Sequence, residues 1–288
     1  MSWATVRVRL PLRVALGGSF HRHVTLVEGP CGWGEMSPLP GYPCHPSAAR
    51  AAATEAAFAG WPPPVRGSVT VNVLVPAVGP GEVAALATGA VDVKVKVGDE
   101  GGLDRVAAVR DAIGPGGRLR VDANGAWDTD QAVAEIARLA RYDVELVEQP
   151  VPTLAGLAEV RRRVAVPVAA DECVRDVADA RELARLGAAD AVVLKVQTLG
   201  GVATALAVAE AAGVPAIVTS MYETSVGLSA GLALAAALPE LPWACGLGTA
   251  SLFAADVVVE PLLAVDGMLT VRRPVPDPAL LARYAVDG

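Results

Sequence analysis

Lysine is almost missing from this 288-residue chain. Only three of its 24 lysine and arginine residues are lysines, and these are Lys94, Lys96 and Lys195. Arginine stays protonated at any useful pH, whereas burial or a neighbouring cation lowers the pKa of a lysine enough for it to act as a base. A chain that uses arginine nearly everywhere else is therefore expected to keep lysine where a removable proton is needed.

A basic surface and a membrane-spanning segment are missing as well. The formal net charge is −7, and the densest basic run, Arg161-Arg162-Arg163, is typical of a solvated helix face. Apolar runs such as residues 227–238 are too short to cross a bilayer, and the N-terminus lacks the charged, apolar and small-residue regions of a signal peptide. We expect a soluble, cytoplasmic protein that acts on a small molecule and has no nucleic-acid or membrane partner.

The cysteines have no metal-ligand spacing. The four of them are scattered at positions 31, 44, 173 and 245, without a CxxC pair. In a cytoplasmic chain such thiols are expected to be reduced and structural.

From about residue 69 onward, short apolar segments alternate with helical segments rich in alanine, leucine and arginine. Eight strand candidates with helical crossovers predict an α/β fold, a TIM-type (β/α)7β barrel over residues 67–267. Residues 1–66 break this rhythm and predict a small N-terminal α+β capping domain, which residues 268–288 are expected to join. An open doubly wound sheet is the alternative, but no GxGxxG or GxxxxGK[ST] motif follows an early strand.

Polar side chains follow five of the predicted barrel strands at their C-terminal ends, where a parallel barrel builds its active site. In strand order they are Lys94 and Lys96, Asp122 and Asn124, Glu148 and Gln149, Asp171 and Glu172, and Lys195 and Gln197. Residues two apart on a strand share a face, so both lysines of the second strand project the same way. Buried charges need partners, and we expect these groups to converge.

The three acidic residues Asp122, Glu148 and Asp171 predict a metal site. Carboxylate oxygens suit Mg²⁺, and the absence of nearby histidine argues against zinc. We expect Lys96 to abstract a proton beside a substrate carboxylate, with Lys94 lowering its pKa. Lys195 is expected on the opposite side of the substrate, with the metal stabilising the enediolate.

These residues resemble the enolase superfamily along nearly the whole chain. The matching stretches are KVK (94–96), VDANGAW (121–127), VEQP (147–150), ADEC (170–173) and LKVQTLGG (194–201). A KxK pair with a lysine on the sixth strand is similar to the muconate lactonizing subgroup, and the seventh strand lacks the histidine of the mandelate racemase branch.

Within that subgroup, GWGEMSPLPGY (32–42) is similar to the capping-domain loop of the o-succinylbenzoate synthase family. The resemblance implies syn dehydration of a succinyl-hydroxycyclohexadiene carboxylate in menaquinone biosynthesis. Lys96 would take the α-proton, and Lys195 would stabilise the enediolate as a cation. The three acidic residues would hold Mg²⁺, with Mn²⁺ as a substitute. The cap loop would close over the site.

Asn124 and Ser225 are the predicted substrate-binding residues. Ser225 stands at a predicted helix start, where anions are favoured, and a simple N-cap is the alternative role. The main alternative activity is racemisation of N-acylamino acids or epimerisation of dipeptides, which the same two lysines would serve. Muconate cycloisomerisation and a non-catalytic barrel that binds a metal and an organic acid are weaker alternatives. The sequence leaves the oligomeric state open.

Overall fold

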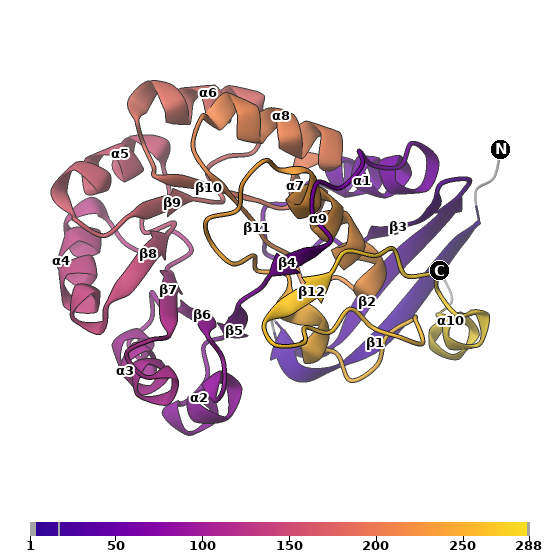
Figure 1. Cartoon of the computed structure of the whole chain (residues 1–288), viewed down its shortest axis with the longest axis horizontal. Coiled ribbons are helices and arrows are strands. Elements are labelled where there is room, and N and C mark those ends of the chain that lie inside the picture. Colours follow the sequence, from indigo (N-terminus) through magenta and orange to yellow (C-terminus); the bar gives the residue numbers. More distant parts are fainter. Residues whose placement is uncertain (1–3, 17, 287–288) are drawn as a thin grey trace.

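The computed structural model describes residues 4–16 and 18–286, in which an N-terminal cap packs against a larger barrel (Figure 1). The outermost residues of the predicted domain ranges, 1–3 and 287–288, lie outside the described part. Every helix in the described ranges is too short or too polar to span a bilayer.

The cap is a three-stranded antiparallel sheet covered on one side by a helix. Its elements are β1 (Thr5–Leu16), β2 (Ser19–Gly29), β3 (Gly32–Met36) and α1 (Pro46–Phe58). The helix lies very close to the sheet where Ala53 and Ala57 face glycines of the strands. A Cβ atom at Gly34 would stand 2.0 Å from the Ala53 carbonyl oxygen, so only glycine fits there.

The barrel is a curled parallel sheet of seven strands. These are β5 (Val73–Val75), β6 (Asp92–Lys96), β7 (Arg118–Asp122), β8 (Val144–Glu148), β9 (Val168–Ala170), β10 (Ala191–Leu194) and β11 (Ala216–Val218), hydrogen-bonded in chain order. Residues 245–246 form single parallel bridges to both edges, Cys245 to Val71 and Gly246 to Thr219. The predicted α/β barrel with an N-terminal cap is confirmed.

Helices surround this sheet on its outer side (Figure 1). They are α2 (Pro80–Ala87), α3 (Gly102–Ile113), α4 (Thr129–Leu139) with η1 (Ala140–Tyr142), α5 (Leu154–Arg163), α6 (Val177–Leu186), α8 (Val202–Ala212) and α9 (Ser225–Ala237). Gly187 and Gly213 end α6 and α8 in the left-handed conformation, with φ of 56° and 63°, which glycine adopts easily.

The sixth barrel strand is shorter than predicted, because the prediction extended it to Gln197. β10 stops at Leu194, and the chain turns at once into a short helix, α7 (Val196–Leu199). Val196 and Leu199 are buried on this helix. A buried helical turn and a buried strand share the same apolar composition, so periodicity does not separate them over so few residues.

The C-terminal segment serves both parts of the molecule. β12 (Met268–Thr270) pairs antiparallel with β4 (Ser68–Thr70) beside the barrel, and η2 (Gly248–Leu252) precedes it. α10 (Pro278–Tyr284) lies against β1, where the Val286 N–H donates to the Arg7 carbonyl at 3.0 Å. The core of the cap also includes Phe253 and its neighbours Val257 and Val258.

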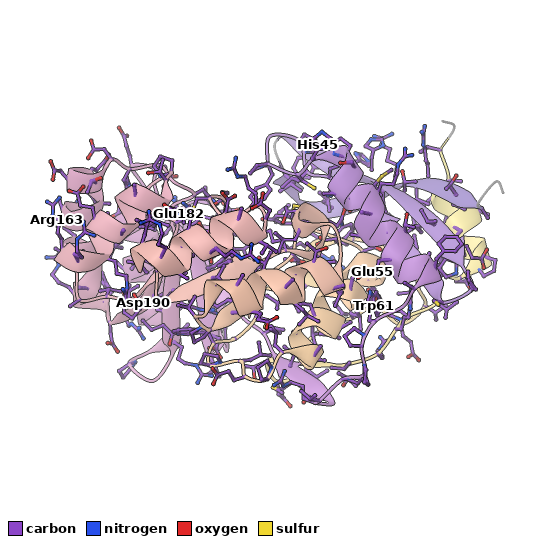
Figure 2. All side chains as sticks on the ribbon, turned by 90° about the horizontal axis from the view of Figure 1, so that it is seen from above. His45, Glu55, Trp61, Arg163, Glu182 and Asp190 are labelled. Carbon is purple, nitrogen blue, oxygen red and sulfur yellow. The ribbon has the colours of Figure 1, made fainter. Side chains whose placement is uncertain are left out.

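Two glutamates of the cap hold the N-termini of two barrel helices. Glu55 of α1 accepts hydrogen bonds from Val202 N and, at 2.9 Å, from Ala203 N at the start of α8. Figure 2 shows Glu55 at the junction between the cap helix and the barrel helices. Glu35 of β3 accepts from Gly227 N at 3.0 Å at the start of α9. Because helix N-termini carry unpaired N–H groups and partial positive charge, both contacts dock the cap on the barrel.

Candidate active site

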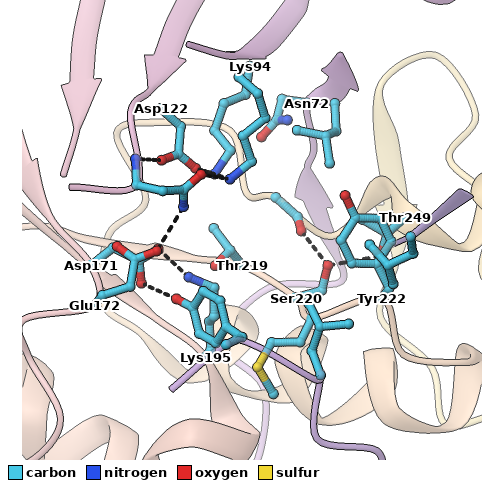
Figure 3. A pocket seen from close by; sticks show the side chains of 18 of the residues that line it. Asn72, Lys94, Asp122, Asp171, Glu172, Lys195, Thr219, Ser220, Tyr222 and Thr249 are labelled. Carbon is cyan, nitrogen blue, oxygen red and sulfur yellow. Dashed lines mark hydrogen bonds and ion pairs between the residues drawn. The ribbon is translucent and has the colours of Figure 1, made fainter. Parts of the chain in front are cut away.

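Neighbouring barrel strands bring the predicted residues into one row. Lys96 pairs in register with Asp122, and Asp122 pairs with Glu148, at the ends of β6, β7 and β8. A cavity of about 390 Å³ opens at this end of the barrel. Its polar wall is formed by Lys94, Lys96, Asp122, Asn124, Asp171, Glu172 and Lys195. In Figure 3, Lys94 and Lys195 point into the pocket from opposite sides.

The two lysines of β6 share one carboxylate oxygen. Lys94 Nζ lies 2.9 Å from Asp122 Oδ2 and 2.7 Å from Glu148 Oε1. Lys96 Nζ lies 2.7 Å from the same Asp122 Oδ2 and 2.7 Å from Asn124 Oδ1. These contacts supply the partners that buried ammonium groups need.

On the far side of the cavity, Lys195 forms an ion pair with Asp171 Oδ2. The other oxygen of this carboxylate, Oδ1, accepts a hydrogen bond from the Tyr42 hydroxyl at 3.1 Å. Lys195 Nζ also lies 4.9 Å from the centroid of the Tyr42 ring. Burial, with the carboxylates of Asp171 and Glu172, raises the pKa of Tyr42, so its hydroxyl stays protonated and donates.

The carboxylates repel one another. Burial first, and then the neighbouring Asp122, raise the pKa of Glu148 to about 7. Burial also raises the pKa of Asp171, even though Lys195 is beside it. Burial opposes the charge of Asp122 too, but there Lys94 and Lys96 outweigh it and lower the pKa. The lysines therefore do not fully compensate the burial and mutual repulsion of these carboxylates, since the pKa values of Glu148 and Asp171 remain raised.

The neighbouring carboxylates favour the charged form of the buried lysines. Burial disfavours the ammonium of Lys94, but Asp122 and Glu148 outweigh it and raise the pKa of Lys94. The pKa of Lys195 is raised in the same way, because Asp171 and Glu148 outweigh its burial. Both groups are therefore cations at neutral pH.

The three acidic side chains provide the type of ligand, carboxylate oxygen, that a hard divalent cation prefers. Asp122, Glu148 and Asp171 offer buried carboxylate oxygens from consecutive strands, and a cation would relieve the repulsion that raises the pKa of Glu148. In the structure the lysine ammonium groups contact these oxygens directly. Within residues 4–16 and 18–286, no three His, Cys, Asp or Glu side chains are already arranged as a metal site.

Strained backbone surrounds the cavity. Asn124, Gln149 and Tyr222 have positive φ of 47°, 40° and 60°, and each follows a barrel strand. The strain at Gln149 aims its amide at the next strand, where Oε1 accepts from Asp171 N at 2.7 Å. Such outliers cost free energy and persist where the surrounding structure holds them, which is characteristic of functional sites.

Of the two predicted substrate-binding residues, the structure brings only Asn124 to the cavity. Its side chain bridges Lys96 and, at 2.8 Å, Glu172 Oε1. Ser225 is fully buried behind the cavity wall, where its hydroxyl donates to Asp256 Oδ2 at 2.6 Å and accepts from Leu262 N at 2.8 Å. These bonds tie the start of α9 to the C-terminal segment, so a structural role accounts for Ser225.

The cap loop, residues 37–45, forms one wall of the cavity through Leu39, Gly41, Tyr42 and Pro43. Arg22 of β2 holds this loop against the barrel. Its guanidinium donates to the Ser37 and Pro38 carbonyls on the loop, and to the Met221 and Tyr222 carbonyls after β11. One buried cation therefore fixes two walls of the cavity.

Sequence reasoning missed Tyr42 as a part of the site. Ser220, which follows β11, and Thr249 of η2 also line the cavity. Their hydroxyl oxygens lie 2.8 Å apart (Figure 3). The signal for Tyr42 was its place at the end of GWGEMSPLPGY, although nothing in that stretch specifies its contacts.

Comparisons with known proteins agree with this geometry. Residues 7–57 match the family described as enolase N-terminal domain-like, and residues 81–277 match enolase C-terminal domain-like. An o-succinylbenzoate synthase of Thermobifida fusca is 52% identical, with 96% of this chain and 90% of the relative covered. One of Mycobacterium marinum is 47% identical, covering 95% and 86%.

Solved structures share the fold of this chain. The crystal structure of muconate lactonizing enzyme from Pseudomonas fluorescens complexed with muconolactone has a TM-score of 0.89 at 24% identity, covering 99% of this chain and 98% of that one. A dipeptide epimerase from Enterococcus faecalis has a TM-score of 0.81 at 24% identity, covering 95% and 97%. Taken together, the cap, the barrel, the lysine and carboxylate row and these matches establish that the chain belongs to the enolase superfamily and, within it, to the o-succinylbenzoate synthase family.

Proposed function

We propose that the chain is a carbon–oxygen lyase that converts a succinyl-hydroxycyclohexadiene carboxylate into o-succinylbenzoate by syn dehydration, in menaquinone biosynthesis. The observation that carries the proposal is one cavity with Lys96 on β6 and Lys195 after β10, with three strands between them in the sheet. Relatives of 47–52% identity bearing the name o-succinylbenzoate synthase support it.

Lys96 is the proposed base. In its neutral form it removes the proton beside the substrate carboxylate, and the electron pair of the broken C–H bond is delocalised onto that carboxylate as an enediolate, from which it enters the ring when the C–O bond breaks. The resulting ammonium returns that proton to the hydroxyl group leaving from the same face, so that water departs and the ring becomes aromatic. Asn124 and Asp122, which bind Lys96 Nζ, hold it in place for both transfers.

Lys195 is the proposed electrostatic partner. Its raised pKa keeps it cationic, so it stabilises negative charge that develops on the opposite face of the substrate. Asp122, Glu148 and Asp171 would hold Mg²⁺, with Mn²⁺ as a substitute. When bound, the ion would supply further positive charge beside the substrate carboxylate.

The test uses the purified full chain and the cyclohexadiene substrate. Aromatic absorbance is followed with Mg²⁺, with Mn²⁺ and with EDTA, and we expect turnover with either metal and loss of turnover with EDTA. An N-acylamino acid is examined in parallel for racemisation. No rise in absorbance, together with rapid racemisation, would contradict the synthase assignment in favour of its main alternative.

A further inference from the structure

Tyr42 of the cap reaches two residues that lie on different barrel strands. Its hydroxyl donates to Asp171, which follows β9, and its ring faces the ammonium of Lys195, which follows β10. Each oxygen of Asp171 has one of these partners, since Oδ1 accepts from Tyr42 and Oδ2 from Lys195. Each of the three side chains therefore contacts the other two, so a change in the position of one affects both others.

The position of Tyr42 is fixed from both sides along the cap loop. Before it, Ser37 N donates to Gln197 Oε1 at 2.8 Å, and the Arg22 guanidinium binds the Ser37 carbonyl. After it, Cys44 Sγ donates to the Gln197 carbonyl at 3.6 Å. Gln197 lies on α7, two residues after Lys195, so the loop is anchored on the segment that carries the lysine.

We propose that Tyr42 is a positioning residue through which the seated cap loop orients Lys195 and Asp171 for the reaction. The ring holds the ammonium against the cavity wall and the hydroxyl prevents Asp171 from rotating away. The proposal rests on the proposed function, because it is there that Lys195 acts on the substrate.

The small number of lysines allows a direct structural test. A chain labelled with ¹³C at lysine Cε gives three signals, one each for Lys94, Lys96 and Lys195, and the Lys195→Arg variant identifies the third. The Tyr42 ring shifts the signal of Lys195 by its ring current. We expect that signal to move toward the random-coil position in Tyr42→Leu and to stay near its wild-type position in Tyr42→Phe. Tyr142→Phe, on η1 away from the cavity, is the matched control.

Kinetics then separates positioning from substrate contact. Loss of the hydroxyl in Tyr42→Phe is expected to lower kcat about tenfold, and loss of ring and hydroxyl in Tyr42→Leu about a hundredfold, with KM changed less than about twofold. An unmoved Lys195 signal in Tyr42→Leu would overturn the proposal, as would an increase in KM with unchanged kcat. The spectra need no turnover, so they decide the Lys195 contact even if the wild-type chain fails to dehydrate the substrate, a result that would contradict the proposed function alone.

Discussion

At the scale of single residues, the presence of two lysines on β6 is explained by the Asp122 carboxylate that both of them contact. Lys94 and Lys96 lie two residues apart on one face, and both ammonium groups contact Asp122 Oδ2. An arginine would keep such an ion pair but would not release a proton. The charge of Lys94 is also shared with Glu148, whereas Lys96 stands nearer the open cavity, with its side chain 27% exposed. This difference supports the proposal that Lys96 transfers the proton.

Lys96→Ala is expected to lower kcat for dehydration by about 10³-fold or more, because general acid/base catalysis is lost. Mg²⁺ affinity, measured by titration calorimetry, should stay within a few-fold, since Lys96 supplies no carboxylate. Lys96→Arg is the matched variant, which restores positive charge beside Asp122 without a base, and should be equally inactive. Turnover near the wild-type rate in either variant would remove Lys96 from the mechanism.

Dehydration is expected to tolerate arginine at position 195 better than at position 96. Lys195→Arg keeps a cation beside Asp171, so dehydration should persist at roughly a hundredth of the wild-type rate, as a misplaced group commonly costs about that factor. Lys195→Ala should abolish dehydration. Any racemase activity should vanish in both variants, because inversion needs a base on each face. Equal dehydration rates in the alanine and arginine variants would show that the charge of Lys195 contributes nothing.

At the scale of elements, the cap is held to the barrel by side chains at helix N-termini. Glu35 of β3 binds the first turn of α9 through Gly227 N and Thr224 N, and Ser37 Oγ donates to it at 2.6 Å. Burial, followed by repulsion from Glu223, raises the pKa of Glu35 to about 7. The junction therefore contains a carboxyl group that changes charge near neutral pH.

This raised pKa predicts a pH dependence of stability. The folded protein binds the proton of Glu35 more tightly than the unfolded chain, whose ordinary value is 4.5. The stabilisation is fully present below pH 4.5 and is lost as the pH rises through about 7. It amounts to at most about 3–4 kcal/mol, since one pKa unit corresponds to about 1.4 kcal/mol.

Urea unfolding of wild type and Glu35→Gln between these pH values measures the effect. Relative to Glu35→Gln, the wild-type protein should have a higher free energy of unfolding near pH 4.5 than near pH 7. Glu182→Gln, on the exposed face of α6, is the control and should parallel wild type. A pH-independent difference between wild type and Glu35→Gln would contradict the assigned pKa.

Elements were predicted well where a local rule specifies them. The helix ends at Gly187 and Gly213 follow from the left-handed conformation that glycine adopts easily. α7 was merged into the preceding strand because its buried residues, Val196 and Leu199, are equally suited to both. The pairing of β12 with β4 joins residues about 200 positions apart, and no local pattern encodes such a partner.

At the scale of the whole molecule, the cavity exists only because cap and barrel meet. Leu39 and Tyr42 come from the cap, while Lys96 and Lys195 come from the barrel. Arg22 joins the two sides through carbonyls of both, and it is 4% exposed. The chemistry of the barrel lysines therefore takes place in a space that the cap shapes.

Metal binding is expected to stabilise the whole fold, because a divalent cation would neutralise carboxylates that repel one another. Mg²⁺ at about a hundred times its Kd should add about 2.7 kcal/mol and raise Tm by about 5 °C, measured by calorimetry. Glu148→Gln, which removes one proposed ligand, should lose most of this rise, whereas Glu182→Gln should keep it. An equal Mg²⁺ response in all three proteins would place the ion elsewhere.

The sequence by itself determined the repeating strands and helices, the polar residues at strand ends and the acidic row from Asp122 to Asp171. Strand periodicity and glycine conformation are local properties, and parallel strands necessarily gather their C-terminal ends on one side. Only the tertiary structure decided that Ser225 is enclosed behind the cavity wall and that Tyr42 reaches Lys195. Those contacts depend on how the cap docks, which is the sum of many weak interactions between segments far apart in the chain.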